Sequence, residues 1–227
     1  MTLLEAIQNR HSVRRYKNLP LAEDVVKALE EKIAEVNSLG DLHVQLILNE
    51  PKGFNGLINY GTFSGISNYL VVAGRKTDDL DERAGYYGEQ IVLLAQQLGL
   101  NTCWAGVSYR KVPGTYTLNE GEKIVCYIAL GYGETQGPQH RMKSAKDISN
   151  ASDLTPLWFR NGVEAALLAP TAVNQMKYYF EYLGRKEGKY IVKASKGHSL
   201  IGYTSLDLGI GKLHFEIGAG KERFEWQ

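Results

Sequence analysis

The chain has 227 residues, of which 44% are hydrophobic and 22% charged, and its formal net charge is +1 at pH 7. This composition is typical of a globular protein of one large or two small domains. The near-neutral charge gives no general attraction to nucleic acid or to a membrane surface, and no stretch approaches the roughly 18 consecutive apolar residues of a membrane-spanning helix. We therefore expect neither nucleic acid nor a membrane as a partner.

The cysteines and the first residues indicate the compartment. Cys103 and Cys126 are the only cysteines, and both lie in apolar segments. Two buried thiols are therefore expected rather than a disulfide. The first residues contain no basic region followed by an apolar run, so no signal peptide is expected. Together these features predict a reducing, cytoplasmic location.

Hydrophobic periodicity predicts helices and strands that alternate along the chain. Helical spacing of apolar residues is present in five segments, residues 2–9, 21–36, 83–98, 159–168 and 204–217. Strands are predicted over residues 42–49, 68–73, 101–107 (a strand or a turn), 123–130, 177–183, 189–194 and 223–226. Residues 50–67 are expected to form a loop with a short helix, and residues 136–152 a polar connector. The pattern favours an α+β fold.

The second part of the chain repeats the element order of the first part in a shortened form. Residues 85–104 and residues 207–226 each combine an amphipathic helix with a strand that ends in tryptophan. Identity between the two parts is negligible, so the repeat is inferred from order and spacing. We expect two related α/β halves, residues 1–150 and residues 151–227.

Two distant segments carry suggestive side chains. Arg10, Ser12 and Arg14 occupy alternate positions, so an extended backbone places them on one face, where two guanidinium groups and a hydroxyl can hold a phosphate ester. The alternative is a solvated surface segment. The second segment is residues 169–175, Ala-Pro-Thr-Ala-Val-Asn-Gln, which is also consistent with an ordinary turn at a helix end.

Three segments in register resemble the FMN-dependent nitroreductases. They are Arg-His-Ser-Val-Arg at residues 10–14, Ala-Gln-Gln-Leu-Gly-Leu-Asn-Thr-Cys-Trp-Ala-Gly at residues 95–106, and Ala-Leu-Gly-Tyr-Gly-Glu at residues 129–134. The resemblance covers most of residues 1–150. It implies a nitroreductase-like α+β fold and FMN as the cofactor.

The chain departs from this family in one instructive way. The family carries a Pro-Ser-x-x-Asn loop after its second helix, but residues 34–41 lack it, and the loop reappears at residues 169–175. The second half in turn lacks the Arg-x-Ser-x-Arg segment. In the family these two parts of the FMN site come from different subunits of a dimer. The chain therefore resembles a single-chain pseudo-dimer with one FMN pocket, and a monomer is expected.

The resemblance implies roles for residues of the first half. Arg10, the His11 backbone and Ser12 would hold the phosphate and lower ribityl chain. Arg14 would lie near the N1–C2=O edge of the ring, where a cation raises the reduction potential. Additional phosphate charge would come from Arg141 and Lys143, which otherwise read as solvated connector residues.

The same resemblance assigns residues that face the ring. Ala105 and Gly106 would form the turn whose backbone N–H faces flavin N5, since glycine allows a close approach of the backbone. Pro170, Thr171 and Asn174 of the second half would cover the ring and bind its polar edge.

Other site classes find no support in the sequence. No histidine pair has metal-ligand spacing and no Cys-x-x-Cys is present, so no metal site is expected. His198 and His214 are interpreted as structural residues, and Gly209 and Gly211 as positions of close helix packing.

The resemblance implies ping-pong hydride transfer from NADH or NADPH, through flavin N5, to a nitroaromatic or quinone-like small-molecule acceptor. No side chain need act as an acid or a base. The alternative is an FMN-binding protein without nicotinamide turnover, which serves as a sensor, a store or a partner-binding module, or is reduced by a protein electron donor.

Overall fold

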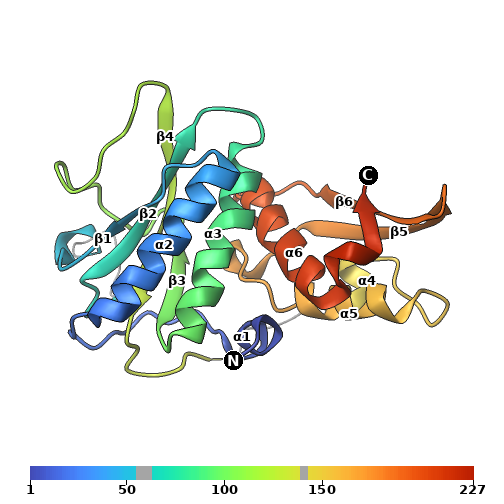
Figure 1. Ribbon diagram of the computed structural model, residues 1–227, viewed down its shortest axis with the longest axis horizontal. Helices are drawn as coiled ribbons and strands as arrows, with labels where there is room; N and C mark the ends of the chain where they lie inside the picture. The colour runs from blue at the N-terminus through green and yellow to red at the C-terminus, as the bar shows by residue number, and fades with distance from the viewer. Residues whose placement is uncertain (55–62, 139–142) are drawn as a thin grey trace.

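The computed structural model describes residues 1–54, 63–138 and 143–227, which form two antiparallel-rich sheets with helices packed between and beside them (Figure 1). The first sheet has the order β1 (Gln45–Ile47), β2 (Asn68–Arg75), β4 (Glu122–Gly131) and β3 (Asn101–Ala105). The second sheet has the order β5 (Tyr178–Lys186), β6 (Lys189–Lys196) and β7 (Phe224–Trp226). The mixed fold confirms the α+β prediction.

All five predicted helices are present, with shifted ends. The helices of the described residues are α1 (Leu3–Asn9), α2 (Glu23–Gly40), α3 (Leu80–Gln97), α4 (Ala145–Ile148), α5 (Leu157–Ala166) and α6 (Thr204–Ala219), with short 3-10 turns at Pro51–Gly53, Ala172–Asn174 and Lys221–Arg223. Only α4 was not predicted. It lies in the supposed connector, where a capping box between Ser144 and Asp147 starts one helical turn.

The segment that follows α1 runs across the first sheet rather than over the surface. Thr2 and Glu5 cap α1 reciprocally, and Arg10 leaves the helix in an extended conformation. The backbone N–H of Val13 then donates to Thr102 O of β3 at 3.0 Å. The Arg-x-Ser-x-Arg segment is thereby fixed beside the start of β3.

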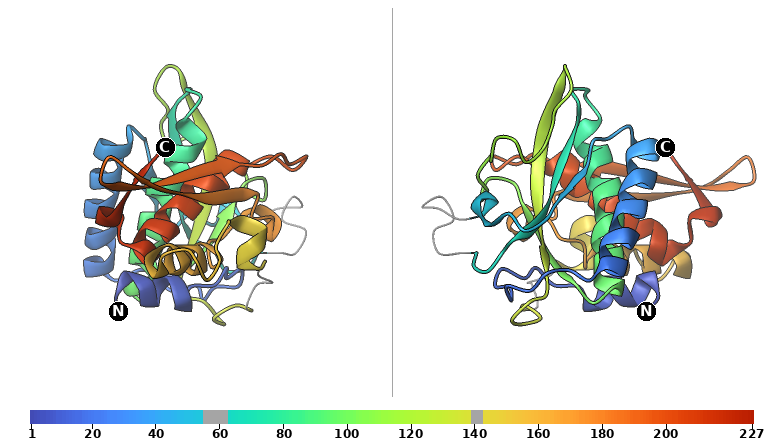
Figure 2. Two further views of the ribbon diagram at one scale, coloured as in Figure 1. Left: turned by 90° about the vertical axis from the view of Figure 1, so that its right-hand side faces the viewer. Right: turned by 60° about the vertical axis from the view of Figure 1, so that its left-hand side comes forward.

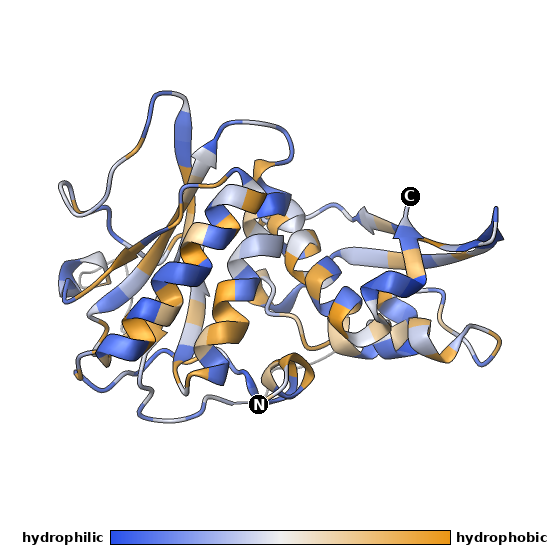
Figure 3. Cartoon of the chain, in the orientation of Figure 1, coloured by the Kyte–Doolittle hydropathy of each residue, from blue (hydrophilic) through white to orange (hydrophobic). Residues whose placement is uncertain are grey.

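Helices α2 and α3 cover one face of the first sheet (Figures 1 and 2). Polar and apolar residues alternate around α2 (Figure 3), and its buried Val25, Leu29, Ile33 and Val36 recur at helical spacing. The opposite face of the sheet holds an aromatic cluster in which Tyr127 stacks on both Tyr69 and Tyr109.

Helices α3 and α6 approach each other unusually closely at the centre of the molecule. A Cβ at Gly85 would lie less than 3.0 Å from Leu206 O, and a Cβ at Gly209 less than 3.0 Å from Glu82 O. The two contacts are equivalent. Gly209 is 124 positions after Gly85, and Leu206 is 124 positions after Glu82, so each glycine contacts the counterpart of the residue that the other glycine contacts. Close packing at Gly209 is thus confirmed, and the register differs by two residues from the sequence comparison, which set 85 against 207.

Each sheet contains two strands that run parallel and are joined through a long helix. Strands β6 and β7, joined by α6, are parallel neighbours. Strands β2 and β3, joined by α3, also run parallel, because each is antiparallel to β4, which lies between them. The second half therefore has its strands and helices in the same order as the first half, but it has no counterpart of β4.

We predict that Gly85→Ala destabilises the fold, because the added methyl group would meet the backbone of α6. Overpacking of this kind costs about 1–3 kcal/mol, and the free energy of unfolding from urea titration is the measurement. Gly197→Ala is the control, since its Cβ would have only ordinary contacts from 3.4 Å outward. Equal stability of the two variants would contradict the close helix contact.

Candidate functional site

A cavity of about 470 Å³ lies where the two halves meet. This volume is within the range of roughly 300–1,000 Å³ typical of ligand and cofactor sites. The first half contributes the segment after α1, the end of β3 and the turn that follows it. The second half contributes the turn after α5 and the first residues of α6.

Seven of the residues predicted to bind the cofactor line this cavity: Ser12, Arg14, Ala105, Gly106, Pro170, Thr171 and Asn174. The segments predicted to share a site are therefore adjacent in the structure. Arg10, His11 and Lys143 do not line the cavity, and Arg141 lies outside the described residues.

Arg10 is buried below the cavity rather than exposed on its wall. Its side chain is 1% exposed, its Nε lies 3.8 Å from Glu89 Oε1, and its Nη2 donates to Leu168 O at 3.5 Å. Nη1 and Nε have no hydrogen-bond acceptor within the described part of the chain. Burial lowers the pKa of Arg10, which Glu89 partly offsets. Arg10 is thus a buried cation beside Glu89, and its Nη1 has no hydrogen-bond acceptor among the described residues.

Glu89 joins the two halves through a buried polar network. Its Oε2 accepts from Trp104 Nε1 at 2.9 Å, and its Oε1 lies 2.9 Å from His214 Nε2. His214 Nδ1 faces Ala165 O at 3.2 Å, so both ring nitrogens face acceptors and a proton must lie between His214 and Glu89. The structural role predicted for His214 is confirmed, whereas Glu89 was not identified from the sequence because buried carboxylates leave no local pattern.

The turn at Ala105 and Gly106 is covered from the second half by Tyr203. A Cβ at Gly106 would lie less than 3.0 Å from the outer end of the Tyr203 ring, so a larger residue here would require the ring to move. Tyr203 has a left-handed φ of 61°, a costly conformation for a bulky residue that often marks functional sites. Burial raises the pKa of its hydroxyl, which therefore remains a proton donor near neutral pH.

The turn after α5 is strained and firmly held. Val173 and Asn174 have left-handed φ values of 45° and 56°. Asp207 Oδ1 accepts from Ala172 N at 2.9 Å, and its Oδ2 accepts from Gln175 Nε2 at 2.7 Å. Burial raises the pKa of Asp207 to about 6. Asp207 is a site residue that sequence reasoning missed, since an acid near a helix start is usually only a dipole contact.

The remaining predicted residues lie nearby. Lys143 Nζ donates to Met176 O at 3.1 Å, which ties the connector to the end of the same turn. His11 is partly exposed, and both burial and Arg10 lower its pKa. Cys103 and Cys126 are free, buried thiols, as predicted, and line the cavity. Burial raises both of their pKa values, so neither is a thiolate near neutral pH.

The described residues contain neither a cluster of metal ligands nor a membrane-spanning helix. No group of three or more His, Cys, Asp or Glu side chains within residues 1–54, 63–138 and 143–227 is arranged to hold a metal ion. In the same residues, every helix is too short or too polar to span a bilayer.

We predict that Glu89→Ala strongly destabilises the protein, because Arg10 and His214 would lose the only anion beside them in the described structure. Removal of one partner from a buried ion pair costs about 3–5 kcal/mol. Glu82→Ala is the control, since Glu82 pairs with Lys212 near the surface and such pairs contribute about 1 kcal/mol or less. Similar urea midpoints for both variants would contradict this assignment.

The family comparison covers almost the whole chain. A family model described as "Putative TM nitroreductase" matches residues 2–219. A crystal structure described as a putative nitroreductase from Thermotoga maritima is 22% identical, with a TM-score of 0.69, over 99% of this chain and 87% of that chain. No curated protein matches the chain significantly.

Two further solved structures are similar to part of the chain. A putative nitroreductase from a Desulfovibrio desulfuricans subspecies, in complex with FMN, is 18% identical over 69% of this chain and 99% of that chain, with a TM-score of 0.52. A putative NADH dehydrogenase/NAD(P)H nitroreductase from Parabacteroides distasonis is 18% identical over 64% and 95%, with a TM-score of 0.50. At these identities the structures establish the fold. Because the family model spans residues 2–219, the chain belongs to this nitroreductase family and is of the oxidoreductase class.

Proposed function

We propose that the protein is an FMN-dependent oxidoreductase that transfers hydride from NADH or NADPH to a nitroaromatic or quinone-like acceptor. The observation that carries the proposal is the single cavity shared by Ser12 and Arg14 of the first half and by Pro170, Thr171 and Asn174 of the second. Bound FMN supplies the hydride chemistry at its N5 position, which no side chain of the chain could provide.

The chemistry of the site fits a flavin mononucleotide. Ser12 and Arg14 on the cavity wall would offer a hydroxyl and a guanidinium to a phosphate ester. Arg10 lies outside the cavity lining, and its Nη1, which has no acceptor among the described residues, would add positive charge from behind the wall. The cavity wall is otherwise mainly apolar, as a planar ring requires. Lys143 would contribute positive charge from the edge of the same turn.

Each wall residue has a distinct task in this proposal. The exposed guanidinium of Arg14 would stabilise negative charge on a reduced flavin and so raise its reduction potential. Ala105 and Gly106 would offer a backbone N–H to the ring, while Pro170, Thr171 and Asn174 would shield it from water. The FMN complex and the NAD(P)H nitroreductase among the similar structures support this cofactor and this donor.

The arrangement of the site also supports a single-chain pseudo-dimer with halves at residues 1–150 and 151–227. The reciprocal contact of Gly85 and Gly209 has the form of a two-fold interface, in which each side makes the same contact with the other. Such a chain needs no second copy to complete its site. We therefore expect a cytoplasmic monomer that binds one FMN and a small-molecule acceptor.

The decisive experiment is anaerobic reduction of the purified protein. We expect one FMN per chain and bleaching of the flavin absorbance within seconds after NADH or NADPH is added, followed by reoxidation when a quinone is added. Flavin that both nicotinamides leave oxidised would favour the alternative, an FMN-binding protein without nicotinamide turnover or one reduced by a protein donor. Protein that takes up no FMN would contradict both.

We predict that Arg14→Ala lowers the midpoint potential of the bound flavin, because a cation beside the reduced ring is lost. Redox titration against a reference dye measures this shift. The neighbouring Arg15→Ala is the control, since Arg15 is equally exposed but does not line the cavity. Equal potentials for the two variants would place the ring elsewhere.

We further predict that Asn174→Gly weakens FMN binding, although Asn174 belongs to the second half. Glycine tolerates the left-handed φ of 56°, so the side chain is removed without added backbone strain. Loss of one hydrogen bond to the ring corresponds to a loss of about 1 kcal/mol, roughly fivefold in the dissociation constant. Quenching of flavin fluorescence measures it, and an unchanged constant would contradict a site shared between the halves.

A further inference from the structure

Helices α3 and α6 carry opposite charges at equivalent positions. The separation of 124 residues that relates Gly85 to Gly209 also relates the first residue of α3, Leu80, to the first residue of α6, Thr204. By this register Arg83 is the counterpart of Asp207, and each is the fourth residue of its helix. A basic residue in one half thus replaces an acidic residue in the other.

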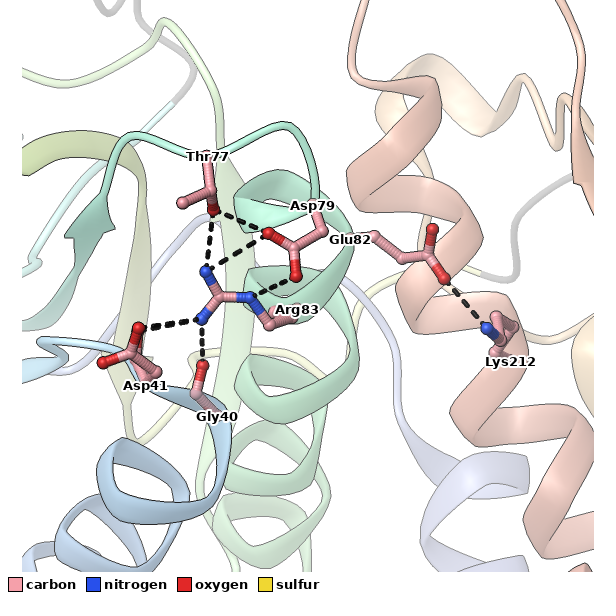
Figure 4. A network of polar contacts seen from close by, with 7 residues as sticks. All are labelled: Gly40, Asp41, Thr77, Asp79, Glu82, Arg83 and Lys212. Atoms are coloured by element: carbon pink, nitrogen blue, oxygen red, sulfur yellow. Dashed lines mark hydrogen bonds and ion pairs between the residues drawn. The ribbon is translucent and has the colours of Figure 1, made fainter.

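Both residues bind the chain that follows the first long helix of their own half. Arg83 Nη1 donates to Gly40 O and to Asp41 O at the end of α2 (Figure 4), and its Nη2 and Nε bind Thr77 and Asp79. Asp207 instead accepts from the backbone N–H of Ala172 and from the side-chain amide of Gln175, beyond the end of α5.

The sign of the charge explains the different shapes of the two segments. A guanidinium only donates, so it binds the free carbonyls at a helix C-terminus and favours continuation of α2 to Gly40. A carboxylate only accepts and is repelled by those carbonyls. Asp207 therefore selects a segment that turns its N–H groups inward, and α5 ends at Ala166 before the open turn that lines the cavity.

The first-half segment is also closed by packing. Gly40 is buried, and a Cβ there would lie less than 3.0 Å from the ring of Tyr87. The Tyr87 ring thus packs directly against the end of the segment held by Arg83. In the second half, Asp207 lies on the cavity wall, but both of its oxygens are occupied by the turn.

We propose that Asp207 is a positioning residue that holds the turn at residues 171–174 against the cofactor, and that Arg83 keeps the equivalent segment of the first half closed, so that the chain forms one site instead of two. This inference rests on the proposed FMN site. It adds the reason why only one half provides a cofactor-covering turn.

The test compares Asp207→Asn and Gln175→Ala with Arg83→Gln as the matched control. Gln175 does not line the cavity, and its side chain binds Asp207, Gly202 O and the Ser199 hydroxyl, so its replacement can affect the cofactor only through these neighbouring segments. We expect each of the first two variants to raise the FMN dissociation constant about tenfold, as the loss of a hydrogen bond to a charged group predicts. Asp207→Asn should also raise the flavin potential, because a buried anion near the ring is removed. Arg83→Gln should lower the thermal midpoint and leave the dissociation constant and the potential unchanged.

Two results would overturn the inference alone. One is FMN binding by Asp207→Asn and Gln175→Ala with the wild-type constant and potential. The other is equal weakening by Arg83→Gln. If Asp207→Asn does not fold, the FMN dissociation constant of Gln175→Ala alone decides whether the inference holds. Wild-type protein that binds no FMN would overturn the proposed function and this inference with it.

Discussion

The close approach of α3 and α6 at Gly85 and Gly209 is the constraint on which the site depends. Without a Cβ at either position the two backbones can touch, and this brings the first turns of both helices to the centre of the molecule. The start of α6 then faces the end of β3, so that Leu206 and Asp207 form a wall opposite Gly106. The close backbone packing thus sets where the start of α6 lies relative to the first half.

The buried network around Glu89 fixes the same arrangement by charge. A buried ion is costly unless it is paired, so the Arg10 guanidinium can be accommodated because Glu89 lies beside it, and the same carboxylate binds His214. Because Trp104 binds the same carboxylate and lies on the cavity wall, the network connects the segment after α1 and α6 to the site. Such a network favours one relative position of the two halves over other positions that would bury the same apolar surface.

Sequence patterns predicted the helices, the strands and the segments that meet at the cavity, because each is encoded by local periodicity or by a short motif. The family motif identified Arg14 and Asn174, and the structure brings both to one cavity. The burial of Arg10 under the wall could not be predicted, since it depends on Glu89, 79 positions away in the numbering. Tyr203 and Asp207 were missed for the same reason: each acts through a partner in a distant segment, and neither has a motif of its own.

The asymmetry of the two halves is what makes a single site possible. Strand β4 has no counterpart in the second sheet, and it places Cys126 on the cavity wall beside the β3 turn. The first half therefore provides a rigid wall, while the second, without that strand, provides a turn whose conformation is set by one carboxylate. In the proposed pseudo-dimer, two halves with the same residue at this position would be expected to form either two open turns or two closed helix ends. The opposite charges of Arg83 and Asp207 permit one of each.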